Sequence, residues 1–146
     1  MARKKHLHST AEQAEAAFYD ALGRADLDAL MAIWAEDDEI ICIHPGAARL
    51  VGHEAIRQSW AAIFERGSVH IRPVQLHASH SLTVAVHNIV EEIQRTPHEQ
   101  HERQDAHILA TNVFIKTTQG WRIVTHHASV AAGQPPAEPL NPALLH

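Results

Sequence analysis

Hydrophobic positions in the first half of the chain recur at helical spacing. Residues 9–13 hold two overlapping capping boxes, which satisfy free amides at the start of a helix. Apolar residues then step by three and four as far as Gly23. Two more apolar stripes of the same period cover residues 27–34 and residues 52–66. Asp26 precedes the first of them and is a candidate N-cap. The pattern predicts three amphipathic helices.

Beyond Gly67 the period changes from helical to extended. Residues 39–44 already predict one short strand, because they are rich in β-formers and end at a Pro-Gly turn. Four long strands follow, over residues 69–80, 82–94, 105–117 and 121–130. A polar hairpin tip at 96–102 and a tight turn at 118–120 join them. The order α-α-β-α-β-β-β-β predicts an α+β domain.

The length and the two ends of the chain set the domain organisation. At 146 residues the chain has room for one hydrophobic core. Residues 1–8 are basic with little to bury, and we expect a mobile lead. Residues 9–131 form the single predicted domain, and residues 132–146 a Pro-rich tail.

Composition excludes several classes of protein. An apolar share of 45% and a charged share of 20% are those of a globular domain, not of a disordered chain. The net charge of −5 argues against a nucleic-acid partner, which needs a basic face. No apolar run approaches the roughly 20 residues of a membrane span, and no secretory signal is recognisable. With Cys42 expected as a lone buried thiol, we expect a cytoplasmic protein.

The strand at 105–117 is apolar on both faces. One face carries Ile108, Ala110 and Phe114, and the other Leu109, Val113 and Ile115. Three helices cannot cover both faces of a sheet, so a second copy of the chain is the simplest cover. We therefore predict a homodimer formed through the sheet.

Three phrases carry a resemblance to a known family. They are residues 18–30 leading to Trp34, residues 51–56, and residues 120–129. Together with the element order they resemble the SnoaL-like branch of the NTF2-like superfamily over about residues 10–131. The resemblance implies a cystatin-like cone, in which a curved antiparallel sheet wraps three helices around an apolar pocket, and it implies dimerisation through the sheet. The superfamily includes isomerases, dehydratases, polyketide cyclases and proteins that only bind or scaffold.

Three positions can be compared with the steroid isomerase branch. The aspartate base of that branch ends the first strand just before a proline, and His44 matches it here. Its oxyanion hole takes a tyrosine from the first helix, where this chain has Phe18, and a protonated aspartate from the penultimate strand, where it has Asn112. Tyr19 is one residue from the tyrosine position, about 100° further around the helix.

His44 is the candidate general base. It shares a strand face with Ile40 and Cys42, which the resemblance directs to the pocket, and an imidazole accepts protons near neutral pH. The alternative is a histidine that only makes a hydrogen bond at the end of a strand.

Asn112 and His127 are the other candidate catalytic groups. Asn112 is an amide on an apolar strand face, so it makes either a structural hydrogen bond or a ligand contact. Counting alternate residues from Trp121 directs Thr125, His127 and Ser129 inward, and His126 to the dimer face. A structural hydrogen bond is the alternative for His127.

Aromatic residues complete the expected pocket. We expect Phe18, Tyr19, Trp34, Trp60 and Phe114 to contact the ligand. The helical spacing of Phe18, Trp34 and Trp60 favours core packing, although in a hollow cone the same side chains also line the cavity. No cofactor is expected. The 14 histidines supply no local pair on one face and no His-Glu-x-x-His motif, so we expect no metal.

Two functions remain open at this stage. The first is a small-molecule isomerase, lyase or cyclase that uses His44 to move a proton on an apolar carbonyl compound. The second is a non-catalytic homodimer of the same fold that binds a ligand or acts as a scaffold.

Overall fold

The computed structural model describes residues 7–94 and 106–135. Three helices, α1 (Ala11–Arg24), α2 (Leu27–Ile33) and α3 (His53–Glu65), confirm the predicted ones within two residues. The strands are β1 (Ile41–Ile43), β2 (Leu50–Val51), β3 (Ile71–His80), β4 (Val84–Ile93), β5 (Ala106–Thr117) and β6 (Gly120–Ala132). The predicted hairpin tip at 96–102, most of the basic lead and most of the tail lie outside the described residues.

The helix ends follow the local chemistry of the sequence. The Thr10 hydroxyl accepts a hydrogen bond from the Gln13 amide at 3.1 Å, which is one of the two predicted capping boxes. At the start of α2, the Asp26 carboxylate accepts a hydrogen bond from the Ala29 amide at 3.0 Å. The first helix does not end at Gly23 as predicted. It continues to Arg24, and Ala25 adopts the left-handed conformation (φ 50°) that closes it.

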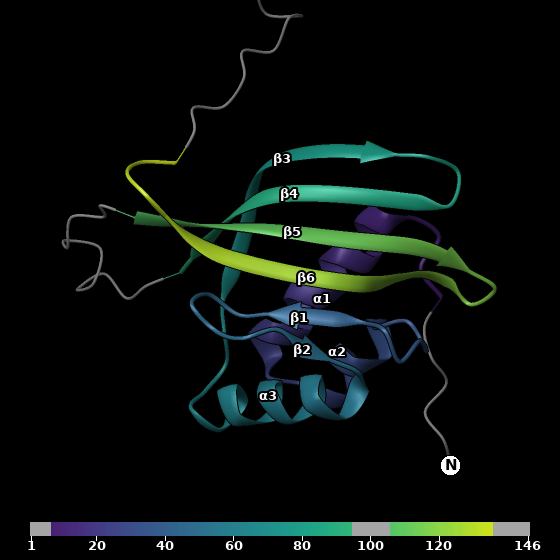
Figure 1. The fold of residues 1–146 in the computed structure, drawn as a ribbon, viewed down its shortest axis with the longest axis horizontal. Helices are drawn as coiled ribbons and strands as arrows, with labels where there is room; N and C mark the ends of the chain where they lie inside the picture. Colours follow the sequence, from purple (N-terminus) through teal and green to yellow (C-terminus); the bar gives the residue numbers. More distant parts are fainter. Residues whose placement is uncertain (1–6, 95–105, 136–146) are drawn as a thin grey trace, which may run out of the picture.

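All six strands form one sheet in the order β2-β1-β6-β5-β4-β3. The helices lie on one side of it: α1 crosses behind β5 and β6, and α3 lies beside β1 and β2 (Figure 1). This architecture confirms the predicted α+β cone. The described strands pair antiparallel as predicted except at one place, where β1 pairs with β6 in parallel, with Ile41 opposite Thr125. The short strand β2 was not predicted.

A bulge in β6 changes which residues of that strand face the helices. Phe114 pairs with Ile123, but Val113 pairs with Thr125. Val124 is therefore an extra residue in β6 that has no partner residue on β5. Successive side chains of a strand point to opposite faces of the sheet. One extra residue therefore reverses which of the following residues point to each face. As a result His126 is 2% exposed and faces inward, whereas His127 is exposed on the outer face.

The prediction that His127 points inward and His126 outward is therefore wrong. Ser129 is also exposed, and Thr125 is half-buried on the same outer side as His127. Counting alternate residues fails at a bulge because the count assumes an unbroken ladder.

The core lies between α1 and the inner face of the sheet. Phe18, Leu22, Ala110, Phe114 and Ile123 are fully buried there. On the opposite face of β5, Leu109, Val113 and Ile115 are half-buried, and Figure 1 shows no described helix over them. The two apolar faces predicted for this strand are thus both present.

Replacement of Phe114 by alanine tests which face is the core. We expect Phe114→Ala to lower the free energy of unfolding by about 3–5 kcal/mol, because the cavity would lie between helix and sheet. Ile115→Ala, one residue away on the outer face, should cost clearly less. The measurement is urea unfolding followed by circular dichroism, and equal losses in the two variants would contradict this assignment.

Candidate functional site

His44 follows β1 directly and lies beside α3. Its Nε2 is 2.5 Å from the Ser59 hydroxyl oxygen, and its ring packs edge-on against Trp60 at 4.7 Å between centroids. Burial lowers the pKa of this imidazole below 6.5. His44 is therefore neutral at pH 7 and able to accept a proton.

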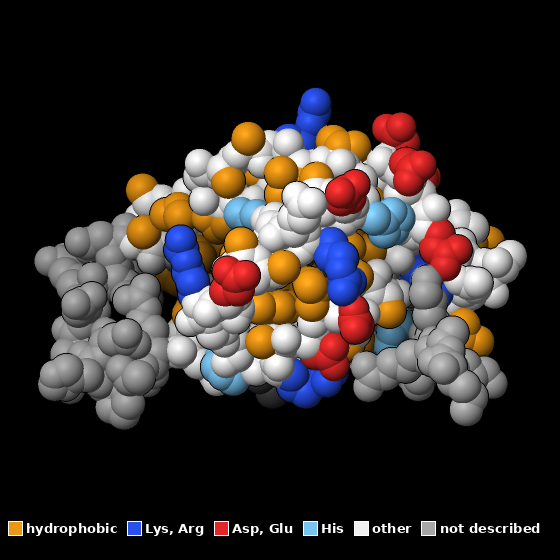
Figure 2. Space-filling view, turned by 90° about the horizontal axis from the view of Figure 1, so that it is seen from below, with side chains coloured by type: hydrophobic (Ala, Val, Ile, Leu, Met, Phe, Trp, Pro, Cys, Tyr) orange, Lys and Arg blue, Asp and Glu red, His pale blue; other side chains and the backbone are white. Residues whose placement is uncertain are grey.

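A hollow opens where His44 meets α3. Its volume is about 330 Å³, and it is lined by His44, Ser59, Ala62, Ile63 and Arg66. Figure 2, which views the molecule from the side of α3, shows hydrophobic side chains exposed between charged ones on this face. The hollow thus combines an apolar wall with a neutral imidazole, and Arg66 contributes to its lining.

The predicted aromatic ligand contacts lie deeper than this hollow. Phe18 is in ring contact with Trp34 at 6.5 Å, with Trp60 at 6.0 Å and with the imidazole of His126 at 5.0 Å. All four of these side chains, like Phe114, are at most 4% exposed. The aromatic residues therefore form a packed cluster behind His44.

Asn112 is the centre of a buried polar cluster. Its side-chain nitrogen lies 3.0 Å from Glu15 Oε2 and 3.1 Å from the Tyr19 hydroxyl. Its side-chain oxygen lies 2.6 Å from Nδ1 of His126. The Tyr19 hydroxyl in turn donates to Glu91 Oε2 at 2.8 Å. Both donors and the acceptor of the amide are thus satisfied inside the protein.

The side chain of Tyr19 contacts Asn112. We did not expect this contact, because the family's tyrosine position is occupied by Phe18, one residue earlier. Glu15 and Tyr19 are four residues apart on α1, with Phe18 between them, so all three face the sheet. The buried face of this helix is wide enough to include Tyr19 beside Phe18. A tyrosine from the first helix therefore contacts the penultimate strand after all.

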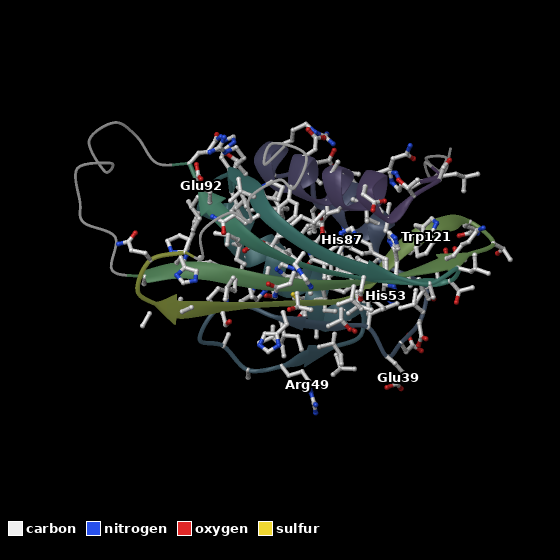
Figure 3. All side chains as sticks on the ribbon, turned by 90° about the horizontal axis from the view of Figure 1, so that it is seen from above. Glu39, Arg49, His53, His87, Glu92 and Trp121 are labelled. Atoms are coloured by element: carbon white, nitrogen blue, oxygen red, sulfur yellow. The ribbon has the colours of Figure 1, made fainter. Side chains whose placement is uncertain are left out.

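The cluster contains three further titratable groups. His87 is fully buried and its Nδ1 donates to Glu15 Oε2 at 3.0 Å, and this hydrogen bond raises the pKa of His87. Figure 3 shows His87 on the sheet directly beneath the helix layer. Burial raises the pKa of Glu91 to about 7 and lowers that of His126 to about 3. His126 is therefore neutral at pH 7, and Glu91 titrates near that pH.

No group of three or more His, Cys, Asp or Glu side chains suited to a metal ion occurs in residues 7–94 and 106–135. Among the same residues, none of the helices is long and apolar enough to cross a membrane. Cys42 is buried and free, and burial raises its pKa to about 12, so its thiol is protonated.

Comparison with known proteins identifies the family. The sequence profile of the SnoaL-like domain matches residues 11–133, which is most of the chain. The chain is a SnoaL-like protein. No curated protein sequence matches it.

Solved structures agree with this assignment. A protein from Thiobacillus denitrificans, provisionally named a calcium/calmodulin-dependent protein kinase type II association domain, is 35% identical to the SnoaL-like protein. It matches 86% of this chain and 98% of its own, with a TM-score of 0.77. A provisionally named dehydratase of the NTF2-like family from Streptomyces avermitilis is 27% identical, over 84% of this chain and 94% of its own, with a TM-score of 0.71. A provisionally named scytalone dehydratase from Novosphingobium aromaticivorans, 13% identical over 85% of this chain and 89% of its own, shares the fold with a TM-score of 0.63.

Sequence reasoning about this SnoaL-like protein missed six polar residues. They are Glu15, Ser59, Arg66, His87, Glu91 and His126. Glu15 lies in the apolar stripe of the first helix, and His87 and Glu91 alternate with Ala85 and Ile89 on one face of a strand. A charged or imidazole side chain in such a stripe is a readable signal of a buried polar cluster. His126 carried no comparable signal, because its orientation depends on the bulge.

Glu91→Gln tests the burial of the Glu91 carboxyl group. The folded protein binds more protons than the unfolded chain between the ordinary pKa of 4.5 and the folded value of about 7, so this carboxyl group makes the wild type less stable as pH rises. Glutamine keeps the acceptor for Tyr19 without a charge. We expect Glu91→Gln to be more stable than the wild type at pH 8, by up to about 3 kcal/mol, and to lose this advantage at pH 5.

Urea unfolding at the two pH values measures this difference. Glu92→Gln is the matched control, because Glu92 is exposed on the other face of the same strand and pairs with Arg72. A stability gain of Glu91→Gln that is the same at both pH values would contradict the assignment.

Proposed function

We propose that this SnoaL-like protein is a small-molecule isomerase, lyase or cyclase whose proton acceptor is His44. One observation carries the proposal: a half-buried imidazole, kept neutral by burial, lines an apolar hollow together with Ser59. A base that is neutral at pH 7 and half-buried beside an apolar wall suits abstraction of a proton next to a carbonyl group. The cytoplasmic location expected from the lone thiol remains part of the proposal.

Each lining residue has a place in the proposed step. His44 Nε2 takes the proton from carbon, while the Ser59 hydroxyl, now bound to that nitrogen, turns to another acceptor. The electron pair moves onto the carbonyl oxygen, and the guanidinium of Arg66 supplies positive charge in the same hollow. In an isomerase the proton returns to another carbon, and in a lyase a leaving group departs.

Two of the expected roles change in this proposal. Asn112 was expected to bind developing negative charge, but both hydrogens of its side-chain nitrogen are engaged by Glu15 and Tyr19. His127 is exposed on the outer face of the sheet. Arg66 takes over that role, because it lines the hollow with His44. The provisional dehydratase names of two structural relatives support reaction chemistry of this class.

Hydrogen–deuterium exchange tests the proton-transfer step without knowledge of the product. A panel of cyclic and aryl ketones is incubated with the protein in deuterated water, and exchange at the carbon next to the carbonyl is followed by NMR. We expect His44→Gln to slow the catalysed exchange at least about 100-fold, the usual contribution of a general base. His80→Gln, which alters an exposed histidine at the end of β3, should exchange like the wild type.

The pH dependence gives a second readout of the same experiment. The exchange rate should rise with pH through a midpoint below 6.5 and then level off, because the neutral form of His44 is the base and burial lowers its pKa. Exchange by His44→Gln at the wild-type rate would refute the role of His44. Absence of exchange with every ketone would leave binding without catalysis as the function.

A second candidate function, association through the sheet, is favoured by the outer face of β5. Leu109, Val113 and Ile115 lie half-buried there, and no described helix covers them. The polar side chains beside them, Asn88 and Thr111, are bonded to each other at 3.0 Å. A relative that is 35% identical is provisionally named an association domain. We propose that two copies of the chain meet at this face.

Sedimentation velocity at micromolar concentration tests the dimer. We expect the wild type to sediment as a dimer and Val113→Asp as a folded monomer, because an unpaired carboxylate would be buried at the contact. Leu82→Asp is the control, since Leu82 is 90% exposed at the turn before β4. A monomeric wild type would exclude this association.

A further inference from the structure

Ser59 and His44 form a hydroxyl–imidazole pair in the hollow beside α3. The Ser59 hydroxyl oxygen lies 2.5 Å from Nε2 of His44, and both residues line the hollow. A serine inside a helix commonly bonds to the carbonyl oxygen four residues earlier, which for Ser59 is that of Ala55. Within the described residues the side chain of Ser59 instead has His44 as its only hydrogen-bond partner. Its hydroxyl is therefore directed from the helix to the imidazole.

The surroundings of Nε2 favour a nitrogen without a hydrogen. His44 is neutral at pH 7, so only one of its two ring nitrogens carries a hydrogen. Besides the Ser59 hydroxyl, the thiol of Cys42 lies near Nε2, with Sγ at 3.9 Å. Burial raises the pKa of that thiol to about 12, so both neighbours of Nε2 have a hydrogen to donate. Nε2 is then the acceptor, and the Ser59 hydroxyl donates to it.

A second serine–histidine pair, on the surface of the protein, provides a comparison. The Ser68 hydroxyl lies 2.9 Å from Nε2 of His70, and both residues are exposed. Ser59 and His44 are half-buried, and the ring of Trp60 packs edge-on against that of His44 at 4.7 Å. Packing thus holds the imidazole beside α3, whereas water reaches both members of the surface pair. A nucleophile needs a base that is held in this way.

We propose that Ser59 is a nucleophile and that the hollow accepts the acyl group of an activated carboxylic ester. The Ser59 oxygen bonds to the carbonyl carbon of the ester while its hydrogen passes to Nε2 of His44. That hydrogen then goes to the departing alcohol as the bond between carbon and alcohol oxygen breaks. Water, with His44 again as the base, releases the carboxylic acid and restores the hydroxyl. This activity shares His44 with the proposed function but needs no proton abstraction from carbon.

The position of Ser59 inside α3 limits the esters that react. The backbone N–H of a residue inside a helix already donates within the helix, so that of Ser59 is not free to stabilise an oxygen anion. The leaving group must therefore be a good one, as in aryl esters, whereas amides should not react. Ala62 and Ile63 form apolar wall, and the volume of about 330 Å³ suits a small apolar acyl group.

Labelling with diisopropyl fluorophosphate tests the nucleophile. We expect the wild type to take up one phosphoryl group, on Ser59, with loss of fluoride, as located by mass spectrometry of its peptides. The labelling rate should rise with pH through a midpoint below 6.5 and then level off, because neutral His44 is the base and burial lowers its pKa. His44→Gln should be labelled at least about 100-fold more slowly.

Ser68 is the internal control in every sample, because it also pairs with a histidine and should stay unlabelled. Folding of His44→Gln is checked by its unfolding transition, and if it does not fold, the pH profile of the wild type decides the role of His44. A wild type without label on Ser59, or with equal labelling of Ser59 and Ser68, would overturn the proposal. Labelling of folded His44→Gln at the wild-type rate would overturn the pairing with His44.

Acyl transfer itself is tested with p-nitrophenyl acetate and with p-nitroacetanilide, its amide counterpart. We expect acetyl-Ser59 in wild-type protein quenched with acid during turnover of the ester, and none with the anilide. Exposed histidines also hydrolyse this ester, so the acetyl group on Ser59, and not the total release of p-nitrophenolate, is the readout. Ester turnover without acetyl-Ser59, at the same rate in Ser59→Ala, would contradict the proposal.

The two proposals fail in distinguishable ways. Proton abstraction is measured on the carbon of the ketone, and acylation on the mass of the peptide that contains Ser59. A protein that exchanges ketone protons but takes no label refutes the nucleophile alone. A protein that is labelled on Ser59 but exchanges no ketone protons refutes the abstraction from carbon alone.

Discussion

A buried carboxylate on α1 organises the interior of this protein. Glu15 is 7% exposed, and its Oε2 accepts from His87 on β4 and from Asn112 on β5. An ionised carboxylate inside a protein is costly unless donors surround it. Helix and sheet must therefore dock in the one register that brings these donors to it. Tyr19 and Glu91 extend the same network toward the far end of the sheet.

The network also explains why the aromatic cluster is packed. The Asn112 oxygen and Nδ1 of His126 bond to each other, and the His126 ring packs against Phe18 with 5.0 Å between the ring centroids. In the related pocket proteins that the sequence resembles, this region is expected to hold a ligand. Here the hollow that carries the candidate base lies further out, beside α3. The chemistry we propose is thus located at the boundary between the packed cluster and solvent.

Much of the fold could be predicted from the sequence, because its signals are local. Thr10 and Asp26 cap the helices they were predicted to cap, and the change of period at Gly67 marks the start of the long strands. The face of His127 could not be predicted in this way. A bulge at Val124 reverses the count, and nothing in the neighbouring residues indicates it. Glu15 was readable as a charged residue in an apolar stripe, whereas the contact of Tyr19 with Asn112 depends on how the helix crosses the sheet.

The parallel pairing of β1 with β6 has a consequence for how the site forms. β3, β4, β5 and β6 follow one another along the chain and pair as neighbours, whereas residues 41–43 of β1 meet residues 125–127. Closing so long a loop is entropically costly, and such contacts form late in folding. His44 follows β1 directly, so the candidate base takes its place only after the last strand has been added. During synthesis, the surroundings of His44 can be completed only after residues 125–127 have left the ribosome.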